Sequence, residues 1–260
     1  LGIAQGNSLI FDSEEEMSVL MDFALNEYRV NNKNTIEIYL EKRGWQNKIE
    51  KDTVLALDLT DISKRYAKKM DFLSTVWDGM EKKKTPGYWV IEVAGASIYE
   101  DYILPLYSEL YSCEAEEFES ENSQLLKAID GVREEIKNKG IWVIDRGGDR
   151  KILISEVISR GLRFIIRINS KRNLTVSGRE TKSAKEISAD TESRKSYKLE
   201  AEDNGVKERR KVYIGKEKVR LPGIRADLFL VVIKGFGEEP MLLLTNVNKD
   251  PVVILEMYLT

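Results

Sequence analysis

Two short apolar runs, each ending in an acid, organise the pattern of hydrophobic and polar positions along the chain. Ile141–Ile144 is too short for a helix and rich in β-branched residues, so it predicts a buried strand that leads directly into Asp145. Residues 53–59 predict a second strand, with Asp58 at its end. Open α/β sheets bind ligands at the carboxyl ends of their strands. We therefore expect both acids at a ligand-binding edge, side by side if the strands are neighbours in one sheet.

The chemistry of the two acids allows two interpretations. Two adjacent carboxylates repel each other, and a divalent cation that prefers oxygen ligands, Mg²⁺ or Mn²⁺, would relieve that repulsion. Alternatively, each Asp caps the helix that follows it, because Asp is a favoured N-cap residue. The second interpretation describes a metal-free structural domain, in which replacing Asp58 or Asp145 would change stability by about 1 kcal/mol and leave Mg²⁺ binding unaffected.

The remaining apolar periodicity predicts a succession of strands and helices. A small helical unit is expected within residues 1–50. Further strands are expected at 88–94, 102–106, 163–168, 228–234 and 241–245, and helices at 114–139, 150–160 and from Pro251 onward. Residues 75–84 are expected to form a polar loop, and Pro86 with Gly87 a turn. Gly140 is expected to cap the end of the long helix, and Asp149 the start of the next one.

This order of elements predicts an α/β fold. The interval of 87 residues from Asp58 to Asp145 holds two strands and a crossover helix, which matches an RNase H-like mixed sheet flanked by helices. Residues 170–245 combine charged stretches with strand patterns, so we expect a β-rich insertion there. The expected organisation is a helical region at 1–50 followed by one α/β domain at 51–260.

Composition narrows the possible chemistry. The contents of 42% hydrophobic and 33% charged residues are typical of a globular protein, and no apolar run approaches the roughly 20 residues needed to cross a membrane. The chain has no His and a single Cys, Cys113. Ser-His and Cys-His nucleophile pairs, His-ligated zinc and an internal disulfide framework are therefore excluded. Carboxylate, Lys, Tyr and metal chemistry remain.

Charge is distributed unevenly along the chain. Residues 163–220 hold 17 Lys/Arg and 9 Asp/Glu, a net charge of +8 within a chain whose net charge is −3. A basic segment in an otherwise acidic protein indicates a local surface for a polyanion. The alternative is a solvated insertion of mixed charge, because acids are interspersed throughout this segment.

The motifs around the two acids resemble those of a known enzyme family. Asp58 is followed by Thr60 in an Asp-x-Thr context, and Asp145 stands in Asp-Arg-Gly. In this order and spacing, from about residue 52 onward, the chain resembles the DDE transposases of the IS4-like insertion-sequence family. That family carries its third catalytic acid in a helical signature, Tyr-x-x-Arg-x-x-x-Glu, which here would start at Tyr258. Its Arg and Glu would then come just after Thr260, so we expect a chain cut off before the third acid.

The resemblance implies a DNA transposase, an enzyme that cleaves and joins DNA at the ends of an insertion sequence. Asp58 and Asp145 would be the catalytic residues of this chain and would hold Mg²⁺ or Mn²⁺ with the absent Glu. The candidate DNA contacts are Lys64, Arg65, Arg146, Arg167, Lys171, Arg172 and Tyr258. The implied partners are the terminal inverted repeats of the element and a second copy of the protein on DNA, with no membrane. The implied location is the prokaryotic cytoplasm, at the nucleoid.

Two other functions stay open at this point. One is another RNase H-like nuclease, and the other is a transposase remnant that binds DNA without cutting it. Glu256 precedes Tyr258 and so does not match the third acid of the signature. A chain with two of three metal ligands is expected to be inactive or nearly so, because developing charge is left unneutralised.

Overall fold

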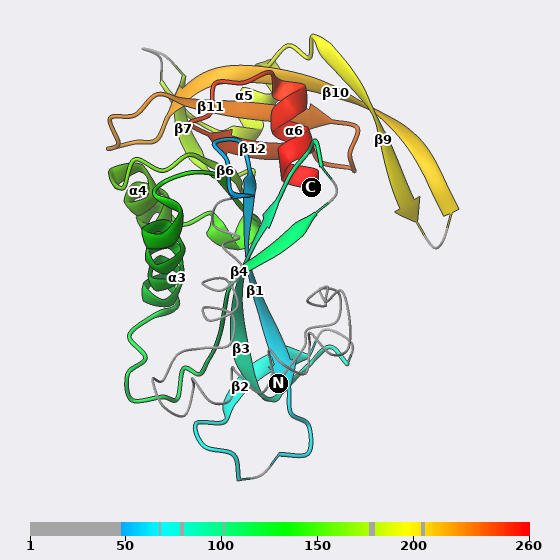
Figure 1. Cartoon of the computed structure of the whole chain (residues 1–260). Coiled ribbons are helices and arrows are strands. Elements are labelled where there is room, and N and C mark those ends of the chain that lie inside the picture. The colour runs from blue at the N-terminus through cyan, green and yellow to red at the C-terminus, as the bar shows by residue number, and fades with distance from the viewer. Residues whose placement is uncertain (1–47, 68, 79–80, 101, 177–179, 204–205) are drawn as a thin grey trace. The chain divides into compact units, whose positions relative to one another are not determined.

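The computed structural model describes residues 48–260, with the exception of 68, 79–80, 101, 177–179 and 204–205 (Figure 1). The helical patterns expected within residues 1–50 fall on residues 1–47 and lie outside the described residues. The chain divides into two compact units. The first unit comprises the residues up to 96 together with 100–140, and the second comprises 97–99 together with 141–260.

The first unit is an antiparallel sheet built around a long central strand, β3. Its strands are β1 (Val54–Ser63), β2 (Ser74–Asp78), β3 (Lys83–Ala96) and β4 (Ile103–Tyr111). β1 pairs with one edge of β3 along its whole length, and β2 and β4 share the other edge. The strands expected at 88–94 and 102–106 are thereby confirmed, although both are longer than expected.

Helix α3 (Glu121–Ile136) packs on β3 and β4 of the same unit. Its start is fixed by Ser120, whose side chain accepts a hydrogen bond from the Ser123 amide, and its buried stripe has a helical period: Leu125, Ala128, Ile129, Val132 and Ile136. The expected helix 114–139 was thus too long at both ends. The expected cap at Gly140 was wrong, because Lys137 takes the left-handed conformation and its amide donates to the Arg133 carbonyl.

The expected position of Asp58 at the end of a strand was wrong. β1 continues to Ser63, because each of its residues from Val54 onward has a partner on β3. Asp58 therefore lies in the interior of β1, where it cannot cap a helix. The apolar run ends before the strand does, since cross-strand hydrogen bonds sustain a strand without apolar side chains.

The expected polar loop at 75–84 and the turn at Pro86 and Gly87 were also wrong. β2 alternates buried and exposed side chains and pairs with the first part of β3, which includes both residues. Gly87 is required there by close packing rather than by a turn: a Cβ atom at this position would lie 2.4 Å from the Ile62 carbonyl oxygen and 2.5 Å from Cγ2 of Val76.

The second unit contains a mixed sheet whose strands follow the order β5-β6-β12-β11-β10-β7-β8, with β9 paired to β10. β5 (Ile141–Ile144) and β6 (Phe164–Arg167) are parallel, and α4 (Lys151–Ser159) connects them. The other pairings in this order are antiparallel. Their strands are β7 (Asn173–Val176), β8 (Thr181–Ser183), β9 (Lys195–Asp203), β10 (Val206–Arg220), β11 (Leu228–Lys234) and β12 (Met241–Thr245).

Local sequence signals fix the last part of this unit. β11 and β12 form the expected hairpin, with Gly235 at φ +90° in its connection. Helix α6 (Pro251–Leu259) begins with the expected Pro, and Asp250 caps it by accepting a hydrogen bond from the Val252 amide at 2.9 Å. A short helix, α5 (Ala184–Asp190), lies between β8 and β9 and was not expected.

The α/β class, with a mixed sheet and flanking helices, is therefore confirmed. The buried residues include every member of β5 and the aromatic ring of Phe164. The boundaries expected at residue 50 and at 170–245 stay predictions. Within the described ranges, no helix combines the length and apolar character needed to cross a bilayer.

Candidate functional site

Asp145 occupies the position expected from the sequence, directly after the buried parallel strand β5. Its side chain is exposed, and Oδ1 accepts a hydrogen bond from the Gly147 amide at 2.6 Å. It thereby caps a single 3₁₀ turn, η2 (Arg146–Gly148), rather than a full helix. A Cβ at Gly148 would lie 2.4 Å from Cγ2 of Ile144, so the turn can fold back on the strand only with Gly there. Asp145 therefore caps the turn that follows it, and among the described residues no hydrogen bond reaches its second oxygen, Oδ2.

Asp145 and Arg167 follow the parallel neighbours β5 and β6, whose residues Ile144 and Ile166 lie opposite each other, and together with Arg146 they act on the hydroxyl of Tyr258 on α6. The hydroxyl is hydrogen-bonded to Arg167 at the end of β6 and interacts electrostatically with Asp145 and Arg146. The pKa of Tyr258 lies above its ordinary value of 10.0, chiefly because its side chain is half-buried, and the carboxylate of Asp145 adds to this rise. The two arginines oppose the rise, because they favour the phenolate. We call Asp145, Arg146, Arg167 and Tyr258 the Asp145 cluster.

The start of α6 is held in place by lysines of the neighbouring strands. Lys195 on β9 pairs with Asp250, the cap residue of α6. Lys216 on β10 donates to the Asn248 side chain at 2.8 Å and to the Lys249 carbonyl at 2.7 Å. These contacts fix the helix that carries Tyr258, so part of the basic segment at 163–220 serves to build the second unit.

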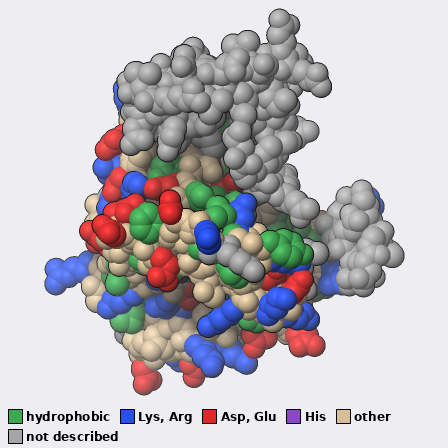
Figure 2. Space-filling view, turned by 90° about the horizontal axis from the view of Figure 1, so that it is seen from below, with side chains coloured by type: hydrophobic (Ala, Val, Ile, Leu, Met, Phe, Trp, Pro, Cys, Tyr) green, Lys and Arg blue, Asp and Glu red, His purple; other side chains and the backbone are tan. Residues whose placement is uncertain are grey.

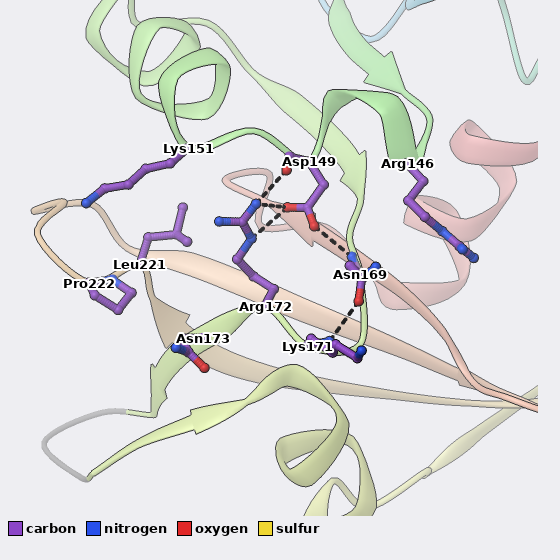
Figure 3. A pocket seen from close by; sticks show the side chains of 9 residues that line it. All are labelled: Arg146, Asp149, Lys151, Asn169, Lys171, Arg172, Asn173, Leu221 and Pro222. Atoms are coloured by element: carbon purple, nitrogen blue, oxygen red, sulfur yellow. Dashed lines mark hydrogen bonds and ion pairs between the residues drawn. The ribbon is translucent and has the colours of Figure 1, made fainter.

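A second group of polar residues lines an open pocket of about 640 Å³ next to this cluster in the same unit (Figure 3). Its lining residues are Arg146, Asp149, Lys151, Asn169, Lys171, Arg172, Asn173, Leu221 and Pro222. Four of the nine carry a positive charge and one a negative charge. We call this hollow the basic pocket.

Asp149 and Arg172 form an ion pair in the wall of the basic pocket (Figure 3). Nε of Arg172 donates to Oδ1 of Asp149 at 2.7 Å, and Nη2 donates to the Asp149 carbonyl at 2.5 Å. Oδ2 of Asp149 accepts from the Asn169 amide at 2.8 Å. The expectation that Asp149 caps α4 was therefore wrong: Arg150 takes the cap position without a side-chain hydrogen bond, because the Asp149 carboxylate binds Asn169 and Arg172 in the connection between β6 and β7.

The other candidate DNA contacts of the second unit differ in exposure and in whether an acid of the protein already pairs with them. Arg172 is largely buried and committed to Asp149. Lys171 and Arg146 are exposed, and neither has a recorded ion pair within the described ranges. The face drawn in Figure 2 carries both basic and acidic side chains.

Asp58 is exposed on β1 of the first unit, and the structure pairs it with an acid that the sequence did not single out. Glu92 on β3 is its direct partner in the antiparallel register. The pKa of Glu92 lies above its ordinary value of 4.5, first because the carboxyl is partly buried and second because Asp58 repels its charge. An acid in the middle of an apolar strand pattern was the available signal for Glu92, but the register that pairs it with Asp58 is a tertiary property.

Lys64 and Arg65 follow the end of β1, and the structure assigns Arg65 a structural contact. Its guanidinium binds the buried carboxylate of Asp78 at 2.7 Å and Glu81 at 2.6 Å. The Lys64 amide donates to the Pro86 carbonyl at 2.7 Å, which extends the β1–β3 pairing. Arg65 thus joins β1 to the end of β2, and its role as a DNA contact stays a prediction, as does that of Lys64.

The donors at Asp58 and Asp145 suit a hard cation, because carboxylate oxygens are the ligands that Mg²⁺ and Mn²⁺ prefer. Asp145 keeps one carboxylate oxygen beyond its cap bond, and Asp58 is exposed with a second carboxyl opposite it. Within the described residues, however, no three Asp, Glu, Cys or His side chains are grouped in a way that could hold a metal ion. Asp58 and Asp145 would therefore need at least one further ligand to complete a metal site.

Comparisons with known proteins found one matching family model and several matching solved structures. A family described only as a family of unknown function (DUF7986) matches residues 1–64, and no curated protein matches. Among solved structures, a piggyBac transposase in a synaptic complex with hairpin DNA, studied by cryo-electron microscopy, is similar with a TM-score of 0.43 and 12% sequence identity. The match covers 76% of this chain and 34% of that chain, so this chain spans about a third of the length of that transposase. Membership of the IS4-like family stays a prediction.

Proposed function

We propose that this chain is part of a DDE-type DNA transposase, with Asp58 and Asp145 as two of its metal ligands. The strongest support is the Asp145 cluster, in which Asp145 and Arg167 follow the parallel neighbours β5 and β6 and Arg167 is hydrogen-bonded to the hydroxyl of Tyr258. The assignment of Asp58 rests on the resemblance alone. Asp58 belongs to the first unit and Asp145 to the second.

Asp58 and Asp145 would hold Mg²⁺ or Mn²⁺ through their carboxylate oxygens. The metal would supply charge neutralisation at the reacting phosphate and activation of a water or hydroxyl nucleophile. Neither acid needs to form a covalent intermediate, which agrees with a chain that lacks His and has a single Cys.

The other members of the Asp145 cluster would bind and orient the DNA backbone. Arg146 is exposed next to Asp145 and can approach a phosphate oxygen. Arg167 has a planar guanidinium that suits phosphate, and its hydrogen bond with Tyr258 limits the directions in which it points. Tyr258 keeps its proton at neutral pH, because the ordinary pKa of tyrosine, 10.0, lies well above neutral and burial raises the pKa of Tyr258 further, so its hydroxyl can donate to an anionic oxygen.

Cleavage of DNA at the ends of the element tests this function. The complete reading frame that contains this chain would be expressed and incubated with Mg²⁺ and a plasmid carrying the DNA that flanks the frame. Asp58→Asn and Asp145→Asn should each lower end cleavage by more than about 100-fold, as expected for the loss of transition-state charge stabilisation. Asp190→Asn, a change of an exposed acid at the end of α5 that pairs only with Lys182 among the described residues, is the matched control.

The outcomes separate the functions that the sequence left open. Cleavage that survives either substitution removes that acid from the metal site. Specific binding to the flanking DNA without Mg²⁺-dependent cleavage, in every variant including the wild type, favours a remnant that binds DNA. Cleavage of any duplex without preference for the flanking ends favours a general nuclease.

A further inference from the structure

The basic pocket is built for an anion by its composition and its openness. Its wall carries the side chains of Arg146, Lys151, Lys171 and Arg172 against one carboxylate, and two Asn amides add hydrogen-bonding groups. The hollow is open to solvent and lined mainly by charged and amide residues, so an extended charged polymer can enter it. Of the nine residues that line it, Leu221 and Pro222 are apolar, and the other seven are charged or carry amides.

The negative charge in the pocket is already neutralised by the protein. Asp149 is 7% exposed and Arg172 22% exposed, and their ion pair has the two nitrogens of Arg172 fixed by two oxygens of Asp149. Oδ2 of the same carboxylate holds the Asn169 amide, and Oδ1 of Asn169 accepts from the Lys171 amide at 2.9 Å. Asp149 therefore orders the segment that carries Lys171.

Two lysines remain to face a ligand. Lys151 and Lys171 are exposed and have no recorded ion pair within the described ranges. In Figure 3, Lys151 extends toward the segment of Leu221 and Pro222, while Arg146 points away from the Asp149–Arg172 pair. Lys151 and Lys171 thus stand on different walls of the hollow, with the ion pair between them.

We propose that the basic pocket binds phosphate groups of a DNA backbone, with Lys151 and Lys171 as the contacting residues. Arg172 and Asp149 are positioning residues that hold the Lys171 segment. The choice of DNA as the polymer rests on the proposed function. The preference for phosphate rests on the four basic side chains that line the pocket. Binding here requires no metal, because Asp58 and Asp145 do not line the pocket.

The salt dependence of DNA binding in EDTA tests the contacting residues. The affinity for a short labelled duplex would be measured by fluorescence anisotropy over a series of KCl concentrations. Each lost lysine–phosphate contact should reduce the slope of log K against log salt by about 0.9 for a duplex. Lys151→Ala and Lys171→Ala should each show this reduction. Lys139→Ala, the loss of an exposed lysine outside both the pocket and the basic segment, should leave the slope unchanged. Wild-type slopes in both pocket variants would overturn the proposal.

Asp149→Asn tests the positioning role by the direction of its effect. Simple electrostatics predicts tighter DNA binding, because a negative charge leaves a basic pocket. A positioning role predicts weaker binding, since the Lys171 segment loses its order. Thermal unfolding of the same variant shows that it is folded at the assay temperature, and tighter binding by the folded variant would refute the role of the Asp149–Arg172 pair.

The remaining outcomes separate this proposal from the proposed function. An RNA duplex of the same sequence that binds more tightly, with the same dependence on Lys151 and Lys171, would replace DNA as the ligand. If metal-free DNA binding is unchanged in both lysine variants while end cleavage requires Asp58 and Asp145, the basic pocket does not bind DNA and the proposed transposase function stands. If DNA binding depends on the two lysines but no variant cleaves DNA, the pocket proposal stands and the transposase function fails.

Discussion

Glu92 lies directly opposite Asp58 on the antiparallel strands β1 and β3, so two carboxylates face each other in the first unit. Like charges in this position destabilise a sheet, and the pKa of Glu92 is raised in part for this reason. In EDTA at neutral pH, we expect Glu92→Gln to raise the free energy of unfolding by about 0.2–1 kcal/mol. Urea denaturation measures this change.

Glu109→Gln is the matched control for Glu92. Glu109 lies on β4, the other neighbour of β3, and pairs with Lys127 at 2.5 Å. Its replacement removes an attraction, so stability should stay the same or fall slightly. If Glu92→Gln were destabilising instead, the repulsion between Asp58 and Glu92 would not be the dominant interaction there. Asp58→Asn should give a gain similar to that of Glu92→Gln, and the two gains should not add.

The ion pair of Asp149 and Arg172 should contribute strongly to the stability of the second unit. Asp149→Ala leaves a largely buried guanidinium and the Asn169 amide without their acceptor. Breaking a buried pair in this way costs about 3 kcal/mol. The comparison is Glu156→Gln, which breaks the 2.5 Å pair between Glu156 on α4 and Arg160, the residue that follows the helix. Because the Glu156 side chain is 43% exposed, the loss should cost about 0.5 kcal/mol or less. Equal urea midpoints for the two variants would contradict this prediction.

Asp250 should stabilise α6 in a way that depends on pH. The Lys195 ammonium and the Val252 amide hold the pKa of Asp250 below its ordinary value of 3.8. A lowered pKa in the folded state means that the stabilisation is present above pH 3.8 and is lost as the pH falls through the lower, folded value. Asp250→Ala should therefore cost about 1 kcal/mol at neutral pH and progressively less in acid.

Thermal unfolding of the wild type and of Asp250→Ala, measured from neutral pH down into the acid range, gives the contribution of Asp250 to stability. Asp227→Ala provides the control, because that exposed acid pairs with Lys218 and Arg220 but caps no helix. Its effect should be smaller at every pH. A cost for Asp250→Ala that stays constant down to the lowest pH would show that the charge of Asp250 is not the source of its contribution.

Tyr258→Phe should remove one hydrogen bond from the Asp145 cluster and keep the ring. We expect a loss of about 1 kcal/mol, because the hydroxyl is half-buried and hydrogen-bonded to Arg167. Tyr213→Phe on β10, where the ring is 47% exposed and lies under Lys211, should change stability little. Urea midpoints distinguish the two, and an equal effect at both positions would mean that the contact with Arg167 contributes nothing.

Much of the secondary structure follows from local sequence patterns. Ile141–Ile144 forms a buried strand, and the apolar runs at 228–234 and 241–245 form a hairpin, as expected. Pro251 begins a helix because its fixed φ and missing amide hydrogen suit a first turn. These elements were predictable because each depends on side-chain periodicity or on one residue's backbone preference, both of which are local.

The sequence predicted which residues belong to the candidate site better than it predicted the contacts that they make. Arg146, Arg167 and Tyr258 were named from the resemblance, and the structure groups them with Asp145. Arg172 was expected to touch phosphate, but it is committed to Asp149, a residue that was expected to cap a helix. No local pattern could reveal that pairing, because the two residues are 23 positions apart and meet only when β6 leads into β7.

By itself, the sequence determined the α/β class, the strand that leads into Asp145, the final helix and the exclusion of histidine chemistry. The tertiary structure alone decided that Asp58 lies inside a strand opposite Glu92, that Asp149 binds Arg172, and that Lys151 and Lys171 flank a shared pocket. The reason is physical: periodicity records which side of an element is buried, whereas the partner of a charged side chain depends on strand register and on loop closure between distant segments.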